Sequence, residues 1–227
     1  MIPLRDTAPR YHTPYVTWTL IALCSAIFLI LQILPDETVR QLTYYYGMVP
    51  IRYSNPTWAT HFGLPPDHYF SFISNLFLHG SWFHWLSNML FLWIFADNVE
   101  DRMGPGRFLV FYLVCGILAT GLQWFFDQAM VIPVIGASGA IAGVLGAYFL
   151  MYPFERVVIW VPILFLPLIF NVPAIGFLGV WVILQIGNAT STLVFSDTVS
   201  TMAWWAHLGG FIAGITLYRL FLKKDYP

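Results

Sequence analysis

Charged residues are scarce in this sequence of 227 residues. They make up 9% of the chain, whereas hydrophobic residues make up 59%. Soluble domains carry about 25% charged residues, so a water-soluble fold would have too few charges to cover its surface. Together with the mean hydropathy of +0.71, this scarcity predicts a protein embedded in a lipid bilayer.

Long basic tracts and cysteine-rich segments are absent as well. The net charge is -1, and no run of lysine and arginine is long enough to follow a phosphate backbone, which excludes a nucleic-acid-binding protein. The two cysteines, Cys24 and Cys115, both lie in apolar runs, where small apolar packing is their expected role. They do not define a redox compartment.

The first apolar run extends from Tyr15 to Leu34. A signal-peptide core is shorter and ends at a small-residue cleavage site, and no Arg-rich and Ser-rich transit peptide comes before this run. About 20 residues at roughly 1.5 Å each span the ~30 Å hydrocarbon core of a bilayer. We therefore expect an uncleaved first membrane helix.

The apolar runs predict an all-α fold, a polytopic bundle of six transmembrane helices in a single domain, 1–227. The expected helices are 15–34, 82–98, 108–127, 137–152, 174–188 and 202–222. Between the fourth and fifth helices, the segment Arg156–Val172 is broken by Pro162 and Pro167. We expect it to approach the fifth helix along the interface, with a re-entrant segment as the alternative.

Lysine and arginine predict the orientation. With the N-terminus in the cytoplasm, the external side holds only Arg40 and Arg52. The other basic residues fall on the cytoplasmic side: Arg5, Arg10, Arg102, Arg107, Arg156, Arg219, Lys223 and Lys224. This is a clear positive-inside bias, and it places both termini in the cytoplasm.

The long connection 35–81 is then external and rich in aromatic residues and prolines. Such a loop can lie in the headgroup layer, where amphipathic rings are favourable. The alternative is a structured element, partly embedded in the membrane, beside an active site.

Small residues surround one serine at the start of the fourth helix. Ser138 lies in the run Gly136-Ala137-Ser138-Gly139. Helix packing explains the small residues, and a helix cap explains the serine, so this segment alone does not define a site. A full G-x-S-x-G elbow is absent because position 140 is alanine.

A histidine lies within the sixth helix. His207, Gly210 and Gly214 share one helix face, which can approach the small residues of the fourth helix. A lone intramembrane histidine can also be a structural hydrogen-bonding residue.

A second histidine begins the second helix. His84 and Asn88 are spaced i and i+4, so their side chains point the same way, and His79 comes shortly before them. A metal site is disfavoured, because there is no H-E-x-x-H pattern and no carboxylate or cysteine in the external half to complete a ligand set.

These three clusters reach a similar depth. The second, fourth and sixth helices all run from the external to the cytoplasmic side, and His84, Ser138 and His207 each lie near the external end. A neutral His207 can take the proton of Ser138. Asn88, His84 and the backbone N–H of Ser138 can donate to the developing oxyanion. We expect a Ser-His dyad, because the sixth helix has no nearby carboxylate.

In these features the sequence resembles the rhomboid family of intramembrane serine proteases over nearly its whole length. The matching segments, in order, are Phe77–Met89, Glu100–Gly104, Gly136–Gly139 and Ala206–Gly210. The resemblance implies Ser138 as nucleophile and His207 as general base.

The resemblance also implies that His84 and Asn88 stabilise the oxyanion, and that Glu100 and Gly104 anchor the cytoplasmic end of the second helix. Implied substrates are single-span membrane proteins, cleaved in or near their transmembrane segments. No metal or organic cofactor is implied, and the oligomeric state is not predicted. The short N-terminus and the lack of further domains are typical of a bacterial plasma membrane.

Two departures from the family pattern stand out. Some members carry a tyrosine one turn after the serine, where this sequence has Ala142, so we expect Trp204 or Trp205 to orient His207 instead. The first loop also lacks an adjacent Trp-Arg pair found in some members.

Two other functions compete with the protease. A non-proteolytic relative that binds membrane clients is disfavoured because both the serine and the histidine are present. A channel or transporter needs polar residues along a full path through the bilayer, whereas here they crowd the external half.

Overall fold

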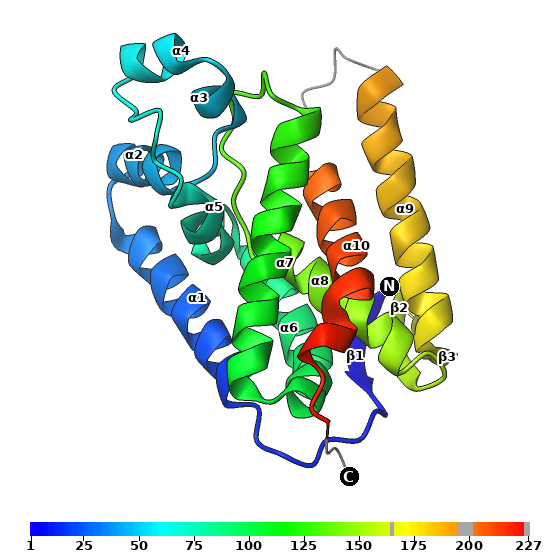
Figure 1. The fold of residues 1–227 in the computed structure, drawn as a ribbon. Helices are drawn as coiled ribbons and strands as arrows, with labels where there is room; N and C mark the ends of the chain where they lie inside the picture. The colour runs from blue at the N-terminus through cyan, green and yellow to red at the C-terminus, as the bar shows by residue number, and fades with distance from the viewer. Residues whose placement is uncertain (164–165, 195–201, 225–227) are drawn as a thin grey trace.

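The computed structural model describes residues 1–163, 166–194 and 202–224. Within them the chain is mostly helical, with one small sheet (Figure 1). The predicted domain 1–227 also includes 164–165, 195–201 and 225–227, which lie outside the described residues.

A helix lies at each of the six expected apolar ranges. These helices are α1 (Tyr15–Ile33), α6 (Trp82–Met103), α7 (Pro105–Phe126), α8 (Ser138–Met151), α9 (Ala174–Val194) and α10 (Trp204–Phe221). Among the described residues, three stretches are long and apolar enough to cross a membrane: Tyr15–Ile33, Pro105–Phe126 and Ala174–Thr192. The fold is therefore that of a membrane protein.

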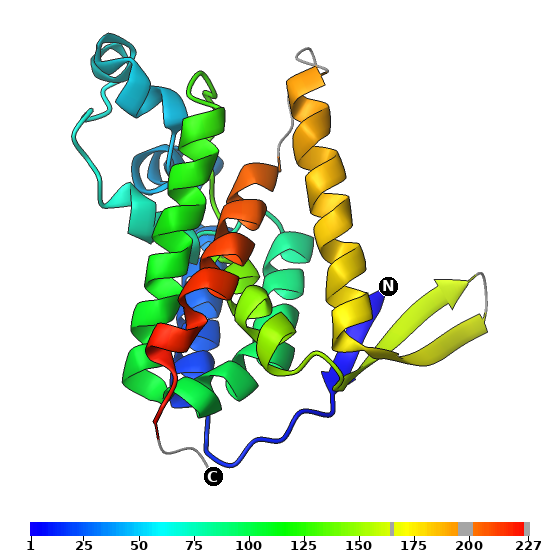
Figure 2. The ribbon, with the colours of Figure 1, turned by 45° about the vertical axis from the view of Figure 1, so that its right-hand side comes forward.

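Helix α8 lies at the centre of the bundle, between α6, α7 and α10 (Figures 1 and 2). Its side chains are buried from Gly139 to Tyr148. Small residues allow this central position, because a Cβ added at Gly143 would lie 2.4 Å from the Cβ of Cys115 on α7. The central helix is thus fixed closely on more than one side.

Local sequence signals set the ends of α6 and the start of α7. The hydroxyl of Ser81 caps α6 by accepting the backbone N–H of His84 at 3.2 Å. Gly104 ends α6 with φ +79°, a conformation that favours glycine. Pro105 then occupies the first turn of α7, where a missing N–H costs nothing.

The connection 35–81 folds into short helices. They are α2 (Asp36–Tyr46), α3 (Pro50–Ser54), α4 (Pro56–His61), α5 (Ser71–Ser74) and the 3₁₀ helix η1 (Asn75–Phe77). Arg52 is fully buried, and its guanidinium donates to the carbonyl oxygens of Tyr44 and Tyr45. Arg52 therefore holds the connection 35–81 together internally.

The expectation of an all-α fold is wrong for residues 156–173. They form β2 (Arg156–Ile163) and β3 (Leu166–Pro173), an antiparallel hairpin that also pairs with the N-terminal strand β1 (Ile2–Asp6). Figure 2 shows the hairpin projecting sideways near the start of α9. The run Val157-Val158-Ile159 is β-branched and favours a strand, and the prolines disfavour a helix. The strands correct the secondary structure expected here, and the position of this hairpin relative to the bilayer stays a prediction.

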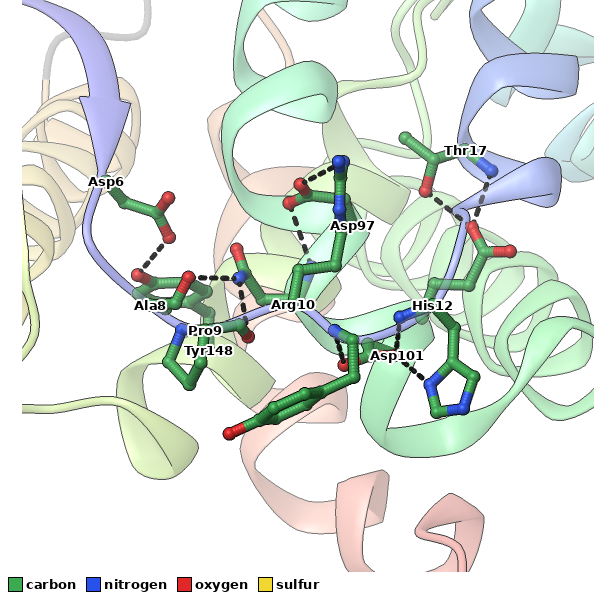
Figure 3. Close-up of polar contacts among 12 residues, drawn as sticks. Asp6, Ala8, Pro9, Arg10, His12, Thr17, Asp97, Asp101 and Tyr148 are labelled. Carbon is green, nitrogen blue, oxygen red and sulfur yellow. Dashed lines mark hydrogen bonds and ion pairs between the residues drawn. The ribbon is translucent and has the colours of Figure 1, made fainter. Parts of the chain in front are cut away.

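The segment between β1 and α1 crosses the end of the bundle where α6 meets α7 (Figure 3). The Tyr148 hydroxyl of α8 donates to the Asp6 carboxylate at 2.5 Å. Burial raises the pKa of Asp6 to about 6, since desolvation outweighs this hydrogen bond. Arg10 pairs with Asp97 on α6 at 3.1 Å. The N-terminal segment is thus fastened to both α8 and α6.

Two acidic residues at the end of α6 hold the start of α1. Asp101 accepts the backbone N–H groups of Tyr11 and His12 at 2.9 Å each. Glu100, which is 2% exposed, accepts the backbone N–H groups of Val16 and Thr17 and the Thr17 hydroxyl. Glu100 therefore satisfies donors of the first turn of α1 that have no partner within the helix.

Replacing Glu100 with alanine is expected to destabilise the protein by about 2 kcal/mol, because three buried donors lose a charged acceptor. Unfolding in detergent by heat or denaturant measures this loss. The matched control is Glu37→Ala, which removes an exposed carboxylate that pairs with Arg40 on the surface and changes stability by less than about 1 kcal/mol. Equal stability of the two variants would refute the anchoring role.

Candidate functional site

Ser138 is the first residue of α8, and Gly136, two residues before it, is held away from a helical conformation. The backbone of Gly136 has φ +123°, and its N–H donates to the carbonyl of Asn75 at 2.9 Å. The Asn75 side chain donates in turn to Ser71 and Thr120. The connection 35–81 therefore fixes the chain just before the serine.

The side chains of Ser138 and His207 meet across α8 and α10. The His207 Nε2 lies 2.9 Å from the Ser138 Oγ, within hydrogen-bond distance. His207 is buried, with 8% of its surface exposed. The sequence placed both residues near the same end of their helices, and the structure brings them into direct contact.

Close approach of the two helix backbones makes this contact. A Cβ added at Gly210 of α10 would lie 1.9 Å from the carbonyl oxygen of Gly139, and one added at Gly214 would lie 2.0 Å from that of Gly143. Ala142 lies in the same contact, 3.1 Å from the added Cβ of Gly210. The small side chain at position 142 is therefore consistent with the tight packing of α8 on α10.

His84 and Asn88 lie against the segment that precedes the serine. A Cβ added at Gly136 would be 2.6 Å from the His84 Nε2 and 3.6 Å from the Asn88 Nδ2. Asn88 is 6% exposed, and within the described part of the chain its Nδ2 has no hydrogen-bond partner. A buried amide donor without a partner is costly and is available to an oxygen bound beside Gly136.

The residue that hydrogen-bonds the far side of His207 was missed by sequence reasoning. The His207 Nδ1 lies 2.7 Å from the Oε1 of Gln185 on α9. Of the two tryptophans expected to orient the histidine, Trp204 meets its ring edge-on at 5.9 Å, whereas Trp205 stacks on Phe126 instead. Of the two, Trp204 is thus the one whose ring lies beside the histidine.

The sequence did contain a signal for Gln185. It is an uncharged polar residue in the middle of the apolar run Ala174–Asn188, and polar residues inside membrane helices are usually functional. Gln123 on α7 is a similar case, since its Oε1 accepts the backbone N–H of Ala206 at 3.2 Å. One glutamine supports the start of α10, and the other contacts its histidine.

Within the described residues, no three His, Cys, Asp or Glu side chains gather in a way that could hold a metal ion. The rings of His79 and His84 are 5.2 Å apart, without a third ligand beside them among these residues. The groups that the structure brings into contact here are the Ser138 hydroxyl, the His207 imidazole and a side-chain amide. The fold and this site define a helical membrane protein with a buried Ser-His pair.

Comparison with known proteins agrees with this class. The model of the rhomboid domain matches residues 66–224, a region that contains Ser138, His207, His84 and Asn88. The chain therefore belongs to the rhomboid family.

Curated relatives carry the same family name. Rhomboid protein 1, mitochondrial, of Saccharomyces cerevisiae is 28% identical over 158 residues, which are 68% of this chain and 42% of the relative. The mitochondrial presenilin-associated rhomboid-like protein of Bos taurus is 33% identical over 147 residues, 61% of this chain and 34% of the relative. YdcA of Bacillus subtilis, a further rhomboid relative, is 30% identical over 94 residues. The chain thus spans less than half the length of these relatives.

Proposed function

We propose that this protein is an intramembrane serine endopeptidase that hydrolyses peptide bonds in or near the transmembrane segments of single-span membrane proteins. The observation that carries the proposal is the 2.9 Å contact between the Ser138 hydroxyl and the His207 imidazole. An adjacent base is what a serine hydroxyl needs to become a nucleophile. Membership of the rhomboid family supports the same reaction.

In the proposed reaction, Nε2 of His207 takes the hydroxyl proton as the Oγ of Ser138 attacks the carbonyl carbon of the scissile bond. The protonated His207 then gives this proton to the leaving amine, and an acyl-enzyme remains on Ser138. A water molecule, deprotonated by His207, hydrolyses the ester and releases the new carboxylate. These steps need no metal or organic cofactor.

The negative oxygen of the tetrahedral intermediate is assigned to the space beside Gly136. The unpartnered Nδ2 of Asn88 and the ring of His84 border that residue. The backbone N–H of Ser138 adds a donor, because the first N–H groups of a helix have no partner within it. Such fixed donors stabilise charge that develops only during reaction.

The membrane arrangement follows from the same proposal. We propose that all six long helices span the bilayer, with both termini on the positively charged side and the site near the opposite face. The relatives above include mitochondrial proteins and a bacterial protein. They support a membrane location without favouring the bacterial plasma membrane expected from the sequence.

Reconstitution into liposomes with a single-span model substrate tests the function. Cleavage of the substrate, blocked by a fluorophosphonate probe whose label maps to Ser138, would support the proposal. Cleavage with the label on another residue would refute the serine assignment. Absence of both cleavage and labelling across a panel of single-span substrates would favour a client-binding member of the family instead.

Replacing Asn88 with alanine is expected to lower kcat on the order of 10²-fold with KM nearly unchanged, because one oxyanion donor is lost and ground-state binding is kept. Steady-state cleavage rates in liposomes give kcat and KM separately. The control is Asn188→Ala, which removes a side-chain amide from α9, a different helix from the α6 helix of Asn88. It is expected to leave kcat unaltered. A rise in KM alone would remove Asn88 from the oxyanion site.

A further inference from the structure

Gln185 lies on the face of α9 that packs into the protein. The buried residues of this helix are spaced along one stripe: Ala174, Phe177, Leu178, Gln185 and Ala189. Gln185 is 6% exposed, in a position where this stripe otherwise carries apolar side chains. Burying an amide is unfavourable unless its polar atoms are hydrogen-bonded, so the partners of Gln185 define its role.

The two ends of the Gln185 amide have different partners. Its Oε1 lies 2.7 Å from the Nδ1 of His207, and its Nε2 donates to the backbone carbonyl of Trp181 at 3.4 Å. A carbonyl oxygen can only accept, so the Trp181 carbonyl orients the amide with its nitrogen away from the histidine. The amide oxygen then faces Nδ1, which must carry the proton of the neutral imidazole.

This tautomer is the productive one. With the proton on Nδ1, the Nε2 of His207 has a free lone pair that faces the Ser138 Oγ at 2.9 Å. The opposite tautomer would place a proton on Nε2 and leave no base for the serine. The Ser138 hydroxyl therefore donates to Nε2 of His207, and Nδ1–H of His207 donates to Oε1 of Gln185.

An amide suits this location better than a carboxylate. A charged side chain inside a membrane protein is costly to desolvate, whereas an amide fixes the imidazole without adding charge. The rings of Trp181 and Trp204 also lie near His207, at 6.1 Å and 5.9 Å. They limit ring movement but offer no acceptor for Nδ1–H at these distances.

We propose that Gln185 is a positioning residue for the Ser138–His207 pair, and that α9 must pack against α10 for the pair to be productive. In the apolar stretch of α9, 28% of the residues are buried, against 44% in the apolar stretch of α7. Figures 1 and 2 show α9 at the edge of the bundle. A peripheral helix thus carries the group that selects the histidine tautomer. This inference rests on the proposed function.

The first test is kinetic. In liposomes, Gln185→Leu is expected to lower kcat and the rate of fluorophosphonate labelling of Ser138 by about tenfold or more, with KM nearly unchanged, because an acceptor worth roughly 1.4 kcal/mol is lost. Gln185→Glu keeps an acceptor oxygen and is expected to be labelled faster than Gln185→Leu. The matched control on the same helix is Thr190→Val, since the exposed Thr190 hydroxyl donates only to carbonyls of α9.

The second test is spectroscopic and needs no substrate. Imidazole nitrogen NMR of protein labelled with ¹⁵N-histidine is expected to show the Nδ1–H tautomer for His207, assigned by its loss in His207→Asn, and a mixture of tautomers in Gln185→Leu. Wild-type labelling rates and an unchanged tautomer in Gln185→Leu would overturn the inference. If the wild-type protein cleaves no substrate and its Ser138 is not labelled, the proposed function fails. If the His207 tautomer still depends on Gln185 in that case, the positioning of His207 by Gln185 stands.

Discussion

Replacing Ser138 with alanine is expected to lower cleavage of a single-span substrate in liposomes by at least about 10³-fold, because the oxygen proposed to attack the scissile carbonyl is removed. His207→Ala is expected to have an effect of similar size. The double variant should be no slower than either single variant, since the two side chains act as one unit. Rate measurements over long incubation at high enzyme concentration resolve these residual activities.

An unfolding measurement and a second serine-to-alanine variant distinguish loss of the nucleophile from loss of the fold. Ser138 makes its contact with His207 through one hydroxyl, so Ser138→Ala should unfold within about 1 kcal/mol of wild type. Ser191→Ala is the control, because the Ser191 hydroxyl is exposed and donates to the Asn188 carbonyl of its own helix. Comparable cleavage by wild type and Ser138→Ala would contradict the nucleophile assignment whatever the fold.

Replacing Gly210 with alanine is expected to abolish the proposed cleavage by a different route. The added Cβ would lie 1.9 Å from the carbonyl oxygen of Gly139, so α10 must move away from α8 by more than about 1 Å. A displacement of that size at reacting groups costs about 10²-fold in rate. Overpacking of this kind also costs about 3 kcal/mol in stability. The rate of cleavage and the free energy of unfolding should therefore both fall.

Gly121→Ala supplies the control, since a Cβ added at this position of α7 meets nothing within 4 Å. An alanine there also favours a helix, so the control should be as active and as stable as wild type. If Gly210→Ala retained wild-type activity, the close contact between α8 and α10 would not be what sets the Ser138–His207 distance.

The parts of this fold that were predictable are those encoded locally. The apolar runs placed the long helices, because about 20 apolar residues carry their own signal. Ser138 and His207 could be paired from topology alone, since their helices run in the same direction. The roles of the family's other residues, Glu100 and Gly104 among them, came from resemblance. The contacts of Glu100 with α1 give that resemblance a physical basis.

The features that escaped prediction depend on partners distant in the sequence. Strand β1 has no strong signal of its own and is defined by its pairing with β2, in which Ile2 lies opposite Trp160. Gln185 carried a recognisable signal as a polar residue in an apolar helix, but its partner His207 lies on another helix. Its significance depends on the rotation of α9, which the apolar pattern of that helix does not fix.

The sheet pairs the N-terminal strand β1 with β2, which follows α8 in the chain. This pairing sets an order of events during synthesis. Thr7 follows β1 and hydrogen-bonds Arg156 at the start of β2 across 149 residues of sequence. At about 5–20 residues per second, roughly 7–30 s separate the synthesis of these two segments. Strand β1 must therefore stay without its partner β2 while α1, α6, α7 and α8 are made. The hydrogen bond from the Tyr148 hydroxyl to Asp6 likewise can form only after α8 has been made.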